Sequence, residues 1–167
     1  MSINAGVYKA MNKLKINAIK RIIKGAKGDR LRGVWIDSDG RTVATDSYRI
    51  IRTKESVPDD IPRASGVDVS RFFNDPRGYD VILPHIKELQ RIIKEARQNR
   101  IKPVYDFGEC LPRVNAKYLL DILRIFPDAV AYRSAGNCKN KAIFFESHSG
   151  DALLLPIYKA EKKDAEQ

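Results

Sequence analysis

Apolar side chains recur at helical spacing in three stretches of the chain. Residues 8–27, 85–98 and 115–126 each place apolar residues every three or four positions, with charged residues between them. The apolar faces comprise Met11, Ala18, Ile19, Ile22, Ile23 and Ala26; Ile86, Leu89, Ile93 and Ala96; and Leu119, Ile122, Leu123 and Phe126. This pattern predicts three amphipathic helices, and Asn115 is a suitable N-cap for the third.

Alternating runs that are bounded by turn residues predict strands between the helices. Residues 31–53 predict a hairpin whose Asp39-Gly40 pair suits a type I′ turn, with a bend near Asp46-Ser47 in the return strand. Residues 55–80 are rich in proline and glycine and predict a loop-rich crossing. Further strands are predicted at 66–70, 79–84, 101–107, 109–114, 129–134, 141–147 and 151–159.

The order of these elements predicts an α+β fold. We expect a mostly antiparallel curved sheet backed by two basic amphipathic helices, with an extra inserted helix. The two β-rich stretches each follow a helix and could be structural repeats that share little sequence. Residues 1–160 are expected to form one domain, with 55–100 as an insertion, and 161–167 to form a charged tail.

The charge balance adds a candidate partner. The 167 residues include 31 Lys and Arg against 21 Asp and Glu, a formal net charge of +10. A domain this basic usually meets a polyanion, and nucleic acid is the first candidate; the alternative is that the charge only aids solubility. The basic positions on the opposite faces of the first two helices are Lys9, Lys13, Lys20, Lys24 and Lys27, and Lys87, Arg91 and Lys94.

Such stripes can follow a phosphate backbone and give salt-sensitive binding without base recognition. The chain has no signature of an RNA-recognition or OB surface, so non-specific contact with double-stranded DNA fits better than base readout. The alternative is that each stripe is an ordinary solvated helix face. Two stripes in one basic chain leave both interpretations open.

Catalytic signatures do not occur in the sequence. Neither a glycine-rich phosphate loop nor a GxSxG nucleophile motif is present, and residues such as His85 and His148 are more often surface histidines than catalytic bases. Cys110 and Cys138 form no metal-binding motif and fit a reducing compartment. No run of ~20 apolar residues and no signal peptide occurs. We therefore expect a non-enzymatic cytoplasmic protein with no metal, no cofactor and no membrane partner.

Three stretches together resemble the bacterial sliding clamp, the DNA polymerase III beta subunit. They are "GVWIDSDGRTVATDSYRII", "VILPHIKELQRII", and the segment from "RVNAKYLLDIL" to "ALLLPIYK". Their order agrees with the family, in which an ATDGHRL-type strand and a closing MPMRL-type strand are characteristic. Ser47-Tyr48 stands where the family has Gly-His, and Tyr158-Lys159 where it has Arg-Leu. A complete clamp subunit has three domains and is much longer.

The resemblance implies a DNA-clamp-like fold and two binding surfaces. In the clamp family these two strands line a cleft for peptides of DNA polymerases and clamp loaders, and basic helices face duplex DNA. The implied peptide-binding residues are Thr45, Ser47, Tyr48, Arg49 and Ile50 on one side, and Leu154, Leu155, Pro156, Ile157 and Tyr158 on the other. The alternative for the last group is a buried core strand.

The expected function is that of a sliding-clamp-like processivity factor in DNA replication. One domain cannot encircle a duplex, so the resemblance implies either a homo-oligomer that closes a ring or an open accessory factor. The alternative function is an interaction module, of phage or mobile-element origin, that binds replication proteins without binding DNA.

Overall fold

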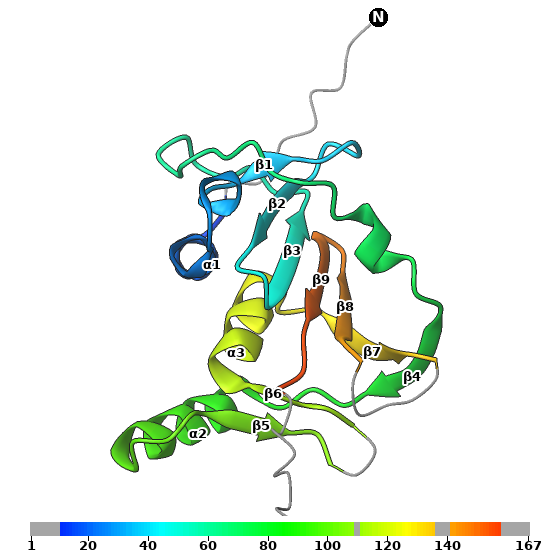
Figure 1. Ribbon diagram of the computed structural model, residues 1–167. Helices are drawn as coiled ribbons and strands as arrows, with labels where there is room; N and C mark the ends of the chain where they lie inside the picture. Colours follow the sequence, from blue (N-terminus) through cyan, green and yellow to red (C-terminus); the bar gives the residue numbers. More distant parts are fainter. Residues whose placement is uncertain (1–10, 109–110, 136–140, 158–167) are drawn as a thin grey trace, which may run out of the picture.

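The chain folds into one large sheet with helices on one of its faces, as the computed structural model of residues 11–108, 111–135 and 141–157 shows (Figure 1). The helices are α1 (Lys13–Gly25), α2 (Ile86–Gln98) and α3 (Ala116–Ile125), with 3-10 turns η1 (Asp29–Leu31) and η2 (Ser70–Phe73). The strands are β1 (Trp35–Ile36), β2 (Thr42–Thr45), β3 (Arg49–Thr53), β4 (Arg77–Val81), β5 (Val104–Asp106), β6 (Arg113–Asn115), β7 (Val130–Ser134), β8 (Ile143–Ser147) and β9 (Gly150–Leu154).

The main sheet has seven strands in the order β1-β2-β3-β9-β8-β7-β4, and all neighbours are antiparallel. A separate pair, β5-β6, lies beside α2 and α3. The predicted α+β class and mostly antiparallel sheet are therefore confirmed. The expected insertion, residues 55–100, contributes edge strand β4 to this sheet as well as α2.

Two units of one helix and three strands make up most of the fold. The first is α1-β1-β2-β3 and the second is α3-β7-β8-β9. They join where β3 pairs with β9, with Ile50 opposite Leu153, and where α1 packs against α3. The sequence suggested that two helix-plus-strand stretches could be structural repeats, and the two units do share the same order of one helix followed by three strands.

Side-chain caps set the starts of two helices. Asn12 accepts a hydrogen bond from the Lys15 amide at 3.0 Å, so α1 begins at Lys13. Asn115 accepts one from the Lys117 amide at 2.9 Å, which confirms its predicted role as the N-cap of α3. Residues 8–10 of the predicted first helix lie outside the described residues, as does the predicted tail 161–167.

The main core lies between the sheet and the helices α1 and α3. Every second residue of the central strands faces it, including Ala44, Ile51, Phe145 and Leu154. The helices contribute residues such as Ile19, Ile22, Leu119, Ile122 and Phe126, all fully buried. The apolar faces read from the sequence for α1 and α3 are thus the faces that pack on the sheet.

The other face of the sheet is covered by the crossing segment, defined here as residues 62–76. Val69 packs with Trp35, Val43 and Ile50, and Phe73 packs with the cluster that contains Phe144. Figure 1 shows this segment passing from β1 along the sheet, through η2, to β4. The strand predicted at 66–70 is wrong: the chain there packs through side chains and ends in η2 without pairing in the sheet.

Two other expectations need correction. The helices that back the sheet are α1 and α3, whereas the second basic helix, α2, packs mainly on α3 and β5. The turn of the first hairpin is not type I′, because Gly40 has a φ of 77° but Asp39 does not have a positive φ. The Gly40 amide bonds to the Asp37 carbonyl at 3.0 Å, which places Gly40 after an ordinary turn.

Candidate functional site

The polar run from Thr45 to Arg49 forms the tight turn between β2 and β3. The Thr45 hydroxyl donates to the Arg49 carbonyl at 2.6 Å. Asp46 accepts hydrogen bonds from the backbone amides of Tyr48 and Arg49, both at 3.0 Å. Ser47 takes a left-handed backbone conformation with a φ of 76°. The polar side chains of this strand pair are therefore needed to close a turn of irregular backbone.

A buried ion network lies beneath this turn. Arg49 is 2% exposed, and its guanidinium bonds to Asp46 at 3.0 Å and to Asp121 of α3 at 2.9 Å. Asp121 also accepts from Arg21 of α1 at 2.9 Å. The Arg49 guanidinium lies 4.3 Å from the centre of the Tyr118 ring. The network ties the turn to both helices of the core, so the charge of Arg49 is committed inside the protein.

An apolar groove opens on the opposite face of the sheet, beside the turn. Its volume is about 250 Å³, and it lies between β3, β9, η1 and the crossing segment. The residues that line this apolar groove are Leu31, Thr45, Ser47, Tyr48, Arg49, Ile50, Val67, Val69, Phe72, Leu153 and Leu155. Tyr48, Val67, Phe72 and Leu155 are large apolar residues that remain exposed there, with Tyr48 at 47% and Leu155 at 40%.

The structure brings together six of the ten residues expected to bind peptide. They are Thr45, Ser47, Tyr48, Arg49, Ile50 and Leu155. The Leu155 amide donates to the Tyr48 carbonyl at 2.8 Å, which fixes the two sides of the groove against each other. The guanidinium of Arg49 is held in the ion network, so we do not expect this group to bind a ligand.

The remaining expected residues lie elsewhere. Leu154 is fully buried on the helix side of the sheet. For this residue the alternative interpretation, a buried core strand, is therefore correct. Pro156 is buried and does not line the groove. The Ile157 amide donates to the Arg113 carbonyl at 2.7 Å, so the chain has already turned toward β6. Tyr158 lies outside the described residues.

The sequence reasoning missed the far wall of the groove. Leu31, Val67, Val69, Phe72 and Leu153 were not proposed. For Leu153, strand alternation was an available signal, because residues 153 and 155 share one face and 154 lies on the other. Val67, Val69 and Phe72 are apolar residues within a proline-rich segment. They were a weaker signal that this segment packs against the sheet.

The lysines of α1 form an exposed stripe. Lys13, Lys20 and Lys24 share one face of the helix, and Lys27 follows its end; all four are exposed. The helix contains no acidic residue, and Lys20 lies 3.3 Å from Asp60. Lys9 lies outside the described residues. The stripe on α1 therefore presents positive charge with little local compensation.

The stripe on α2 is more mixed. Lys87, Arg91 and Lys94 are exposed along one face, but Arg91 pairs with Glu95 at 2.9 Å. Both α1 and α2 pack on α3, which lies between them (Figure 1). The two basic stripes therefore lie on helices that α3 separates, and they do not form one continuous basic surface.

Asp128, Ser147 and His148 form a cluster of the residue types that catalysis uses, at the β8–β9 turn. His148 lies 2.8 Å from Asp128, and the Ser147 hydroxyl donates to the same carboxylate at 2.6 Å. These contacts, first that of the Ser147 hydroxyl, hold the pKa of Asp128 well below its usual value. Because Ser147 bonds to the carboxylate and not to the imidazole, the cluster anchors the β8–β9 turn and is not a nucleophile with its base.

The residues that the structure describes include no candidate metal site and no candidate membrane span. There, no three His, Cys, Asp or Glu side chains gather as metal ligands. Within the same residues, no helix has the length and apolar character needed to cross a bilayer. Cys110 and Cys138 lie outside the described residues.

Comparisons with known proteins provide no counterpart of the groove. No protein-family model matches the sequence, and the searches of curated proteins and of solved structures found no match either.

Proposed function

We propose that the protein is a non-enzymatic, sliding-clamp-like accessory factor that docks a peptide of a replication partner and contacts duplex DNA. The observation that carries the proposal is the convergence of residues 45–50 with the end of β9 around the apolar groove. These two segments are more than a hundred residues apart, and they are the two stretches that resemble the peptide-binding strands of the clamp.

The backbone at Ser47 supports the relation to clamps. The clamp motif has glycine at this position, and glycine adopts a left-handed backbone without steric cost. Ser47 has a φ of 76°, a backbone conformation that favours glycine, at the position where the clamp motif has its glycine.

Replacing Ser47 by glycine is expected to stabilise the protein by up to about 1 kcal/mol, because the strain of a positive φ disappears. Urea unfolding of the variant and the parent protein measures the difference. Ser38→Gly, at an exposed turn residue with no positive φ, is the control and should be neutral or destabilising. Destabilisation by Ser47→Gly relative to this control would contradict the assigned turn geometry.

The groove has the properties of a docking site for apolar side chains. Eight of its eleven lining residues are apolar, and the Thr45 hydroxyl is already bonded to the Arg49 carbonyl. Little polar capacity is left to recognise a charged ligand. A short peptide with aliphatic or aromatic anchors fits this chemistry, as in other grooves that bind linear segments.

Leu155→Asp is expected to weaken binding of a peptide from a bacterial DNA polymerase III or clamp loader by roughly tenfold to hundredfold. The reason is that a charge replaces an apolar contact at the groove's edge. Fluorescence anisotropy with labelled peptide measures the affinity. Ile101→Asp is the matched control, because Ile101 is 64% exposed and does not line the groove. Equal affinity in both variants would remove the peptide-docking half of the proposal.

The α1 stripe supports the DNA half of the proposal. Lysines separated by seven and four residues on an acid-free helix can contact successive phosphates without reading bases. α2 suits this role less, because Glu88 and Glu95 interrupt its positive charge. A chain of this size needs further copies to surround a duplex, so a closed ring requires a homo-oligomer.

The second candidate function is an interaction module that binds replication proteins without binding DNA. The ion pair of Lys20 with Asp60 favours it, because this pair partly neutralises the centre of the α1 stripe. A measurement of affinity for duplex DNA distinguishes the two functions. Both functions require the groove, whereas only the first requires the lysines of α1.

A further inference from the structure

A second cleft lies away from the apolar groove, between the start of α2 and the end of α3. Its volume is about 490 Å³, roughly twice that of the groove. The residues that line it are Leu83, Pro84, His85, Ile86, Lys87, Leu123, Pro127 and Ala129. Ile82 and Val130, the chain neighbours of Leu83 and Ala129, are 90% and 53% exposed.

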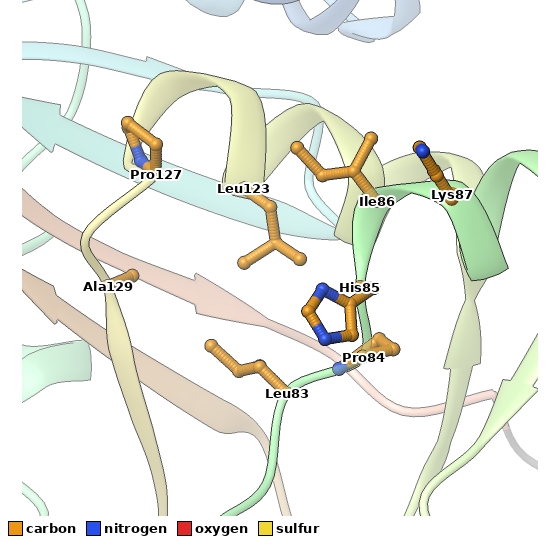
Figure 2. A pocket seen from close by; sticks show the side chains of 8 residues that line it. All are labelled: Leu83, Pro84, His85, Ile86, Lys87, Leu123, Pro127 and Ala129. Carbon is orange, nitrogen blue, oxygen red and sulfur yellow. The ribbon is translucent and has the colours of Figure 1, made fainter.

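The chemistry inside the cleft is aliphatic. Figure 2 shows Leu83, Leu123 and Ala129 around the space and the His85 ring directed between the two leucines. None of the eight lining residues is phenylalanine, tyrosine or tryptophan. The one aromatic ring among them, the His85 imidazole, points between two leucines, so these residues present no large aromatic face on which a nucleic-acid base could stack. Aliphatic side chains of a protein partner match this lining better.

The charge at the edge of the cleft is positive. Lys87 stands at the edge on the first turn of α2, and none of the eight lining residues is acidic. Arg91 and Lys94 continue from Lys87 along the same exposed face of α2. Glu88, the acidic neighbour of Lys87, lies on the side toward Tyr105, where its charge adds to the effect of burial in raising the pKa of that phenol. A ligand that leaves the cleft along this face thus meets Lys87, then Arg91, which pairs with Glu95 at an exposed site, and then Lys94.

We propose that the cleft binds a segment of a protein partner in which aliphatic side chains are followed by a run of carboxylates. The aliphatic side chains fill the space between Leu83, Leu123 and Ala129. The carboxylates lie along Lys87, Arg91 and Lys94. This inference is independent of the proposed function, because the cleft shares no residue with the groove and none with α1. It assigns the α2 stripe to a protein ligand and not to DNA.

The test uses the full chain and a fluorescein-labelled peptide in which two leucines precede four glutamates. Fluorescence anisotropy at low salt measures its affinity. Two comparison peptides replace the leucines by alanine or the glutamates by lysine. The parent peptide is expected to bind at least about tenfold more tightly than either, because it alone supplies both the apolar and the charge contacts.

Variants of the protein locate the binding. Lys87→Glu is expected to weaken binding by about tenfold or more, whereas Lys24→Glu on α1, with the same change of net charge, should have a much smaller effect. Ala129→Phe should weaken binding strongly by occupying the space beside Leu83 and Leu123, with its melting temperature checked against the parent protein. Leu155→Asp in the groove should leave the affinity unchanged, which separates this result from failure of the proposed function.

Several outcomes would overturn the proposal. These are an alanine peptide that binds as tightly as the leucine peptide, or equal losses in Lys87→Glu and Lys24→Glu. Displacement of the peptide by duplex DNA that depends on Lys87 would assign the stripe to DNA. A dimer, seen by light scattering, that Ala129→Phe dissociates would assign the cleft to a second copy of this chain.

Discussion

Arg49→Ala is expected to lower the free energy of unfolding by about 3–5 kcal/mol, the range for breaking a buried ion pair by removing one partner. The guanidinium is 2% exposed and is shared between Asp46 and Asp121. Without it, two carboxylates remain buried, and of the two only Asp121 keeps a cationic partner, Arg21. The loss should be accompanied by loosening of the turn, because the same Asp46 carboxylate accepts the amides of Tyr48 and Arg49.

Urea or thermal unfolding of the variant measures this effect. Arg91→Ala is the control: Arg91 also pairs with a carboxylate, but both side chains of the Arg91–Glu95 pair are more than half exposed, so the change should cost less than about 1 kcal/mol. Arg49→Lys should recover little, because an ammonium cannot bridge two carboxylates with the fixed geometry of a guanidinium. Similar unfolding energies for Arg49→Ala and Arg91→Ala would show that the network is not intact in solution.

The combined substitution of Lys13, Lys20 and Lys24 by glutamate is expected to reduce affinity for duplex DNA by more than about a hundredfold at low salt. Each lysine in contact with a phosphate contributes about one unit to the dependence of log affinity on log salt concentration. The parent protein should therefore show a steeper salt dependence than the variant, by about three units. Filter binding or anisotropy over a range of salt concentrations gives both quantities.

The matched control reverses three other exposed lysines, Lys54, Lys102 and Lys117, none of which lies on α1 or α2. It changes the net charge by the same amount, so any difference between the two variants reports the position of the charge. Equal losses would mean that DNA binding depends on net charge alone. Absence of binding by the parent protein at low salt would leave the interaction module without DNA binding as the function.

The ion network links the two surfaces of the proposed function. Arg21 belongs to α1, Asp121 to α3, and Asp46 and Arg49 to the turn that lines the groove. The turn that forms the groove wall is thereby held against the helices through charge-assisted hydrogen bonds, which are shorter and stronger than neutral ones. In the proposed function, a docked peptide would meet a wall whose backbone is already fixed, which would reduce the entropy lost on binding.

The sequence by itself determined the local elements of this protein. Helical periodicity located α1, α2 and α3, and the Asn115 cap was readable because an N-cap bond joins residues only two or three positions apart. The bend at Asp46-Ser47 was likewise visible, since residues that favour turns do so through their own backbone and side chains. The resemblance to clamps predicted that residues 45–50 and the last strand lie beside each other, and the structure adds that β3 and β9 pair directly.

Only the tertiary structure decided how these elements meet. It showed that α2 packs outside α3, that the crossing segment supplies Val67, Val69 and Phe72 to the groove, and that the Arg49 guanidinium is committed to a buried network. Each of these facts depends on contacts between residues distant in the chain. Periodicity states that a face is apolar but not what covers it, because many partners offer the same apolar surface and packing selects among them.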